Sequence, residues 1–180
     1  MSTTDVFMYF AFGSNLLKER LQLANSSAVY YCNGRLKDYK LCFGLWDENI
    51  DNAWHGGVAS IEACPGAEVW GVIWALSKES ISTLDNQEGV NLGMYSPLEV
   101  SVDTDEGAVL CRTYQMNNFH ACLPSPQYKQ VVCLGAQQNN IPVEYRNRLE
   151  MVETNSYSGP SVLDQLRTQC KSLFLDLKIK

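Results

Sequence analysis

Apolar and polar positions change their spacing along the chain, and the early part of the pattern predicts mainly strands. An apolar and aromatic run over 6–12 indicates a buried strand, and leucines at helical spacing over 16–23 indicate a helix. β-branched and aromatic residues then predict strands over 28–32 and 39–46, before a polar loop over 47–55. The leucines expected to contact the core are Leu16, Leu17, Leu21 and Leu23.

The middle of the chain carries two pairs of strand-like segments, and each pair flanks residues that favour turns. Pro65-Gly66 separates the first pair, and Asp105-Glu106-Gly107 separates the second, which is typical of a hairpin. The four segments are 57–62, 68–75, 95–102 and 109–116. The pattern therefore predicts two turns, each joining two consecutive strands.

Helices are predicted between these pairs and in the last third of the chain. Ser77 is expected to cap a helix over 78–87, and Pro126 and Pro142 stand where helices begin. The expected ranges of the last three helical segments are 126–133, 142–152 and 162–177. Strands followed by helices predict an α+β fold or a small barrel with flanking helices, and periodicity does not choose between them.

Length and composition are those of one soluble domain. The chain has 180 residues, of which 46% are hydrophobic and 19% charged. We expect a single domain over 1–180, with 154–180 as a C-terminal helical extension. The net charge of −6 argues against a nucleic-acid partner or an anionic membrane surface. No apolar run approaches the ~20 residues of a membrane-spanning helix.

Cysteine and histidine usage indicates neither disulfides nor a metal site. The seven cysteines are odd in number and form no C-x-x-C pair, so free thiols in a reducing cytoplasm fit best. Most have apolar neighbours and are expected to be small buried hydrophobes. His55 and His120 have no metal-ligand spacing, so we expect no metal and no cofactor.

A candidate binding loop follows the first predicted strand. The apolar run stops abruptly at Gly13-Ser14-Asn15. A strand that ends in such a turn leaves backbone N–H groups without sheet partners, and these can hold a carboxylate or an oxyanion. Taken alone, the tripeptide is also compatible with an ordinary turn.

Glu88 is a candidate proton shuttle near the end of the predicted 78–87 helix. A carboxylate there meets the unfavourable end of the helix dipole, and Asp85 lies three residues back on the same face. Both effects raise a carboxyl pKa toward neutrality. Taken alone, Glu88 is equally compatible with a solvated surface residue.

Several motifs, in their order and spacing, give the chain a family resemblance from Tyr9 to about Tyr157. They are Tyr9-Phe10-Ala11-Phe12-Gly13-Ser14-Asn15-Leu16, Trp54-His55-Gly56-Gly57, Glu68-Val69-Trp70-Gly71-Val72, Asp85-Asn86-Gln87-Glu88-Gly89-Val90, Gly93-Met94-Tyr95, Pro124-Ser125-Pro126-Gln127-Tyr128-Lys129 and Pro142-Val143-Glu144-Tyr145. Together they resemble the gamma-glutamylcyclotransferases. The resemblance implies an α+β fold, a small mixed β-barrel with flanking α-helices.

The resemblance also implies an activity and a set of site residues. The substrate is expected to be a small gamma-glutamyl amino acid, whose α-amine attacks its own γ-carbonyl to give 5-oxoproline and a free amino acid. Glu88 is the implied acid–base residue. The implied substrate-binding residues are Gly13, Ser14, Asn15, Leu16, Tyr95, Tyr114 and Tyr128. A homodimer in the cytoplasm is the expected form, and Phe12 stands where the family commonly has tyrosine.

Other functions stay open at this point. A related cyclotransferase would act on gamma-glutamyl amines or glutathione, although the Pro-Ser-Pro-Gln-Tyr segment favours the amino-acid branch. A binding protein would hold gamma-glutamyl compounds without turnover, and the departure at Phe12 is its best support. A serine hydrolase is poorly supported because no G-x-S-x-G motif is present. A cysteine hydrolase would need a pair with His55 or His120.

Overall fold

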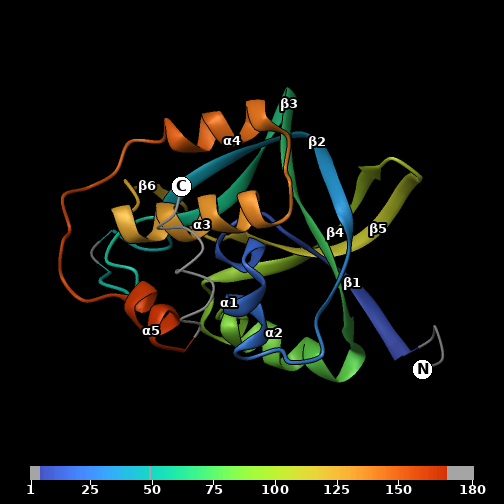
Figure 1. Ribbon diagram of the computed structural model, residues 1–180, viewed down its shortest axis with the longest axis horizontal. Helices are drawn as coiled ribbons and strands as arrows, with labels where there is room; N and C mark the ends of the chain where they lie inside the picture. Colours follow the sequence, from blue (N-terminus) through green and yellow to red (C-terminus); the bar gives the residue numbers. More distant parts are fainter. Residues whose placement is uncertain (1–4, 49, 170–180) are drawn as a thin grey trace.

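A mixed β-barrel forms the centre of the computed structural model, which describes residues 5–48 and 50–169 (Figure 1). Its strands are β1 Val6–Ala11, β2 Val29–Leu45, β3 Val58–Ser77, β4 Tyr95–Thr104, β5 Gly107–Met116 and β6 His120–Ala121. The strand order is β3-β1-β5-β4-β2-β6, and an additional pairing of β3 with β2 closes the first five strands into a barrel. The β1–β5 pair is parallel and the others are antiparallel, so the predicted fold class is confirmed.

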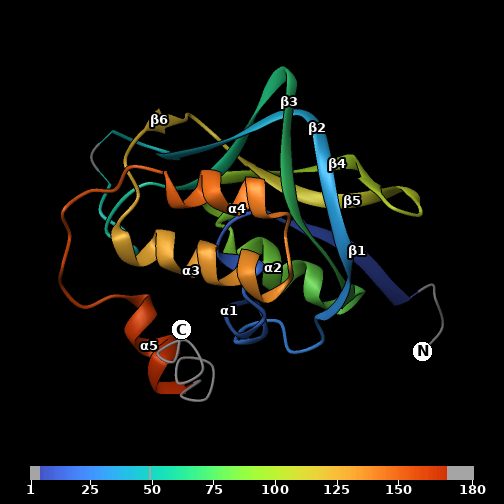
Figure 2. The same ribbon diagram turned by 45° about the horizontal axis from the view of Figure 1, so that its top comes forward.

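Helices cover the outside of this barrel (Figures 1 and 2). They are the 3-10 segments η2 Ser14–Leu16, η3 Lys78–Ser80 and η4 Val90–Leu92, and the α-helices α1 Lys18–Gln22, α2 Ile81–Gln87, α3 Pro126–Gln138, α4 Val143–Glu150 and α5 Val162–Gln169. Both views show α3 beside α4, and α3 also contacts η2. The predicted 162–177 helix begins as expected, and its part beyond residue 169 lies outside the described residues.

The predicted turn at Pro65-Gly66 is wrong. Both flanking segments belong to β3 and pair with the long strand β2, not with each other: Tyr39 pairs with Ala63 and Lys37 with Glu68. The intervening residues form an irregularity in the strand, where the Gly66 N–H donates to the carboxylate of Asp38 at 2.9 Å. Likewise, the two strands predicted over 28–32 and 39–46 are one strand, because β3 continues to pair with β2 between them.

Other local predictions are confirmed where the signal was a cap or a tight turn. Thr104 pairs with Gly107, which closes the β4–β5 hairpin as expected. The Ser77 hydroxyl accepts from the Glu79 N–H and caps η3, which leads into α2. Pro126 begins α3 as predicted, with Ser125 as its cap, and α3 extends five residues beyond the predicted end at Cys133.

The core fills the barrel and the space beneath the helices. The largest side chains with essentially no exposure include Phe10, Trp74 and Leu76. Leu16, Leu17 and Leu21 are fully buried as predicted, but Leu23 is 48% exposed because α1 ends at Gln22.

The cysteines differ from the prediction. Among those the structure describes, Cys111 is buried, whereas the other five are partly exposed. All six are free thiols, and Cys170 lies outside the described residues. For Cys32, Cys42 and Cys64, which lie in strands, apolar neighbours in sequence do not ensure burial, because alternate residues of a strand face opposite sides of the sheet. Within residues 5–48 and 50–169, no helix is long and apolar enough to cross a membrane.

Candidate active site

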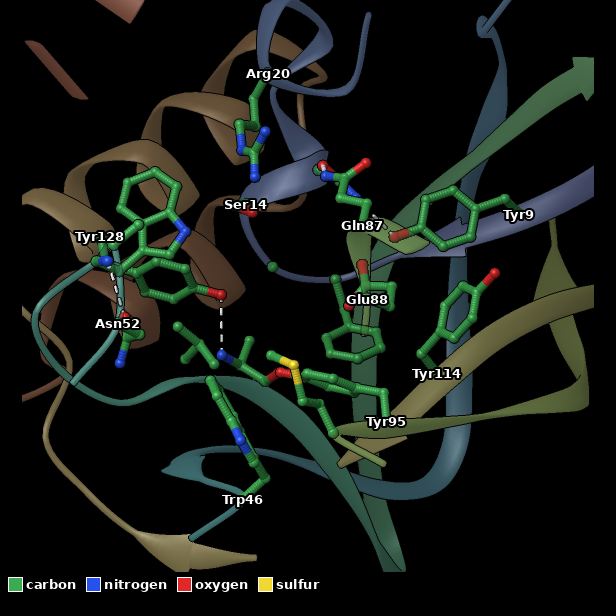
Figure 3. Close-up of a pocket in the computed structure, with 18 residues that line it drawn as sticks. Tyr9, Ser14, Arg20, Trp46, Asn52, Gln87, Glu88, Tyr95, Tyr114 and Tyr128 are labelled. Carbon is green, nitrogen blue, oxygen red and sulfur yellow. Dashed lines mark hydrogen bonds between the residues drawn. The ribbon is translucent and has the colours of Figure 1, made fainter. Parts of the chain in front are cut away.

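A pocket of about 250 Å³ opens at one end of the barrel (Figure 3). It is lined by residues from β1, η2, α1, the 46–54 segment and the end of α2, together with three tyrosines from strands or a helix. The predicted site residues that line it are Gly13, Ser14, Asn15, Glu88, Tyr95, Tyr114 and Tyr128. Phe12, the residue that departs from the family pattern, lines it as well. The pocket therefore brings together residues that are distant in sequence.

Leu16 is the predicted site residue that does not line the pocket. Its side chain is fully buried in the core, and its backbone carbonyl accepts from the Asn139 side chain at 2.8 Å. Leu16 thus holds the preceding turn against α3 through packing and one hydrogen bond. The place of Leu16 in the motif is therefore explained by this packing.

Glu88 stands at the end of α2 and faces the pocket (Figure 3). Its N–H still bonds the Leu84 carbonyl at 3.0 Å, so it completes the last helical turn. Gly89 follows with a left-handed φ of 67°, a conformation that glycine adopts without steric cost. This residue ends the helix and leaves the Glu88 side chain on the pocket wall.

The environment of Glu88 suits a group that must both take and give a proton. Burial raises the pKa of Glu88 to about 7, Arg20 opposes the rise, and Asp85 adds to it. Asp85 itself is bound by the Arg112 guanidinium at 2.8 and 2.9 Å. The raised pKa agrees in direction with the sequence analysis, but its first cause is burial, which the sequence did not reveal.

This raised pKa predicts that Glu88 destabilises the folded protein at alkaline pH. The folded state binds the proton more tightly than the unfolded state, so this contribution to stability falls as pH rises from 4.5 to about 7. We expect Glu88→Gln to be more stable than the wild type at about pH 8, by roughly 1–3 kcal/mol. Urea unfolding at about pH 8 and about pH 4 measures the difference, which should vanish at the lower pH. An equal difference at both would contradict the raised pKa.

Tyr128 presents a hydroxyl whose hydrogen is free to be donated into the pocket. Its oxygen accepts from the Ala59 N–H at 2.9 Å, and the Ser14 amide also contacts it. Burial raises the pKa of Tyr128 well above its usual range, so the hydroxyl keeps its proton. The ring packs edge-on against Trp54, with centroids 5.1 Å apart. Figure 3 shows the hydroxyl directed at the centre of the site.

The other two predicted tyrosines are held by partners within the protein. The Tyr95 hydroxyl donates to the Ala59 carbonyl at 2.8 Å. The Tyr114 hydroxyl donates to Asp85 and accepts from Arg112 Nε at 3.1 Å, so both of its functions are occupied. Tyr114 therefore contributes mainly its ring to the pocket and its hydroxyl to the Asp85 cluster.

A buried amide network, which the sequence analysis missed, connects the candidate binding loop to the helix that carries Glu88. Asn15 donates to the Tyr9 hydroxyl at 3.1 Å and accepts from Gln87 Nε2 at 3.1 Å. Gln87 in turn accepts from Asn25 at 2.9 Å, and Trp74 Nε1 donates to the Asn15 carbonyl. The network fixes the turn against the end of α2. Tyr9 and Gln87 both belong to the quoted motifs, and this membership was the sequence signal available for the network.

Two pocket features carried no sequence signal. Arg20 on α1 lines the pocket, although its spacing is that of an ordinary surface arginine. Trp46, the last residue of a predicted strand, forms another part of the wall beside Trp54, which belongs to the quoted Trp54-His55-Gly56-Gly57 motif.

Known proteins resemble this chain over most of its length. The gamma-glutamylcyclotransferase of Bos taurus is 53% identical over 86% of this chain and 83% of the relative, and that of Homo sapiens is 49% identical over the same shares. Residues 68–149 match the AIG2-like family. A solved structure described as a gamma-glutamyl cyclotransferase has a TM-score of 0.88 at 45% identity, covering 92% of this chain and 99% of its own. On this similarity, the chain belongs to the gamma-glutamylcyclotransferase family of enzymes.

Proposed function

We propose that the protein converts gamma-glutamyl amino acids to 5-oxoproline and a free amino acid, with Glu88 as the acid–base group. The observation that carries the proposal is a carboxyl with a pKa of about 7 that faces a small pocket beside a backbone turn. The family to which the chain belongs supports the same reaction. The α-amine attacks the γ-carbonyl of its own glutamyl residue, and the C–N bond to the leaving amino acid breaks.

Glu88 meets the two proton requirements of this reaction in turn. As a carboxylate it takes a proton from the α-amine, and as an acid it gives a proton to the leaving nitrogen. A pKa near the working pH makes both forms available, and such a shuttle is worth roughly 10²–10⁴-fold in rate. The carboxyl returns to its starting state after each cycle, so no cofactor is required.

The remaining catalytic contribution is positioning. The nucleophile and the carbonyl belong to one molecule, and well-oriented intramolecular reactions reach effective molarities of about 10⁵–10⁸ M. In our proposal the Gly13–Asn15 amides and the Tyr128 hydroxyl hold the glutamyl carboxylate and the developing oxyanion. The Asn15–Gln87 hydrogen bond supports this role, because it keeps these donors fixed relative to Glu88.

A cytoplasmic location and a homodimeric state, both implied by the sequence, belong to the same proposal. Cytoplasmic location is supported by free thiols at all six described cysteines. Pairing as a homodimer rests on the family resemblance. Gel filtration combined with light scattering measures the mass in solution, and a monomer mass across protein concentrations would contradict the dimer.

The test is release of 5-oxoproline by the purified protein from gamma-glutamyl-alanine, gamma-glutamyl-ethylamine and glutathione. We expect the alanine compound to have the highest kcat/KM. A preference for glutathione or the ethylamine compound would assign the protein to another branch of cyclotransferase chemistry. Saturable binding without product would support the binding-protein alternative, for which Phe12 was the sequence argument.

A further inference from the structure

Arg20 is a cation in the pocket that forms no ion pair with any residue the structure describes. It projects from α1 into the site, and its guanidinium lies over the Trp54 ring, 5.8 Å from the centroid (Figure 3). Its Nε atom is buried and lacks a hydrogen-bond partner, and the guanidinium forms no ion pair with any carboxylate of residues 5–48 and 50–169. Arg112, by contrast, is paired with Asp85 at 2.8 Å.

Such an arrangement favours a negatively charged ligand. Arg20 is partly buried, and this removal of the cation from water lowers its pKa from the ordinary value. A buried charge without a partner is costly, and a guanidinium prefers a carboxylate that accepts two parallel hydrogen bonds. Glu88 interacts with Arg20 electrostatically, but it forms no ion pair with it and is needed as a proton shuttle in the proposed reaction.

The proposed substrate carries two carboxylates, and their positions relative to the reacting atoms differ. The glutamyl carboxylate is attached to the carbon that bears the attacking amine. It must therefore stay near Glu88 and the turn amides. The carboxylate of the leaving amino acid lies on the other side of the scissile bond and points away from the glutamyl half.

Arg20 belongs to the partly exposed part of the pocket lining. Its guanidinium stacks on the buried ring of Trp54, next to the exposed residue Ala53. Tyr95 and Tyr128, which line the pocket as well, are instead buried. In the proposed reaction the turn amides hold the glutamyl carboxylate, so Arg20 is the cation that remains for the second carboxylate of the substrate.

We propose that Arg20 binds the carboxylate of the leaving amino acid and thereby selects gamma-glutamyl amino acids over gamma-glutamyl amines. This inference rests on the proposed cyclotransferase function and adds a specificity-determining residue to it. Arg20 makes no contact with the reacting atoms in this role. Its effect is expected mainly on KM, because the leaving carboxylate is bound alike in the ground state and the transition state.

The experiment compares two substrates that differ by one carboxylate, gamma-glutamyl-alanine and gamma-glutamyl-ethylamine. The readout is the ratio of their kcat/KM values for 5-oxoproline release, at about pH 9, where Glu88 is ionised. In Arg20→Met this ratio is expected to fall about 30- to 100-fold, as for loss of a charged hydrogen-bonded pair. Effects of the substitution on folding or on Glu88 act on both substrates and cancel in the ratio.

Two further variants make the result specific. Arg148→Met removes an arginine that also stacks on a ring, at 5.2 Å from Tyr145, but lies outside the pocket, so the ratio is expected to stay at the wild-type value. Arg20→Lys keeps the charge, so its ratio is expected to lie between those of Arg20→Met and the wild type.

Two results would overturn the inference, and they are distinguishable. If Arg20→Met lowers kcat/KM equally for both substrates, Arg20 serves the glutamyl half or the fold and does not bind the leaving group. If the wild type releases no 5-oxoproline from either substrate, the proposed function itself fails and the inference falls with it.

Discussion

Replacing Glu88 with glutamine is expected to lower kcat/KM for gamma-glutamyl-alanine roughly 10³-fold, the middle of the range for loss of a general acid–base group. Glutamine keeps the shape of the side chain and its place at the end of α2, but its amide cannot accept the proton of the α-amine. The KM should change little by comparison. The measurement is 5-oxoproline release by wild type and variant, each verified to be folded by circular dichroism.

A matched substitution separates the catalytic effect from a general change of charge. Glu79 lies on the preceding 3-10 turn, is exposed and does not line the pocket, so Glu79→Gln should retain wild-type activity. If folded Glu88→Gln keeps more than about a tenth of the wild-type rate, the acid–base assignment is wrong.

The pH dependence of the wild type provides a second readout of the same residue. The proposed cycle begins with the carboxylate form of Glu88, and the pKa of this group is about 7. We therefore expect kcat/KM to fall about tenfold for each pH unit below that value and to level off above it. In Glu88→Gln the residual activity should lack this inflection. An unchanged inflection in the variant would assign it to another group.

Replacing Gly135 with alanine is expected to destabilise the protein by about 2 kcal/mol, although alanine normally favours a helix over glycine by about 1 kcal/mol. Gly135 lies in the last turn of α3, where the helix meets the backbone that follows the candidate binding turn. A Cβ at this position would lie 2.5 Å from the Leu17 nitrogen and 2.6 Å from the Leu16 carbonyl carbon. Backbone atoms cannot move aside as a flexible side chain can, so the helix and the turn must separate.

The same displacement is expected to reduce activity. A shift of the 13–15 turn moves its amides away from Glu88, and a misplacement near 1 Å can cost about 10²-fold in kcat/KM. Urea unfolding and 5-oxoproline release measure the two effects. Gln137→Ala, on the exposed side of the same helix, serves as the control and should alter stability by less than about 0.5 kcal/mol. If Gly135→Ala were more stable than the wild type, the contact between α3 and the backbone of Leu16 and Leu17 would not be rigid.

The sequence predicted the elements whose signals are local. Asp105-Glu106-Gly107 specified a hairpin because a tight turn fixes which strands meet. Ser77 specified a helix start because a cap bonds to an N–H only two or three residues away, and Pro126 specified another because its fixed φ suits the first helical turn. Pro65-Gly66 misled the prediction because its surroundings depend on β2, a strand about 28 residues distant in the chain.

For the site, the motifs by themselves determined the family and seven of the residues that line the pocket, including the acid–base residue to test. Only the tertiary structure decided how these side chains work. It partly desolvated the Glu88 carboxyl, engaged the Tyr114 hydroxyl with Asp85 and, among the described residues, gave the Tyr128 hydroxyl hydrogen no acceptor. It also placed Arg20 in the pocket without an ion-pair partner among the residues the structure describes. The physical reason is that desolvation and hydrogen-bond partners come from segments that meet only when the barrel closes, and no local pattern encodes them.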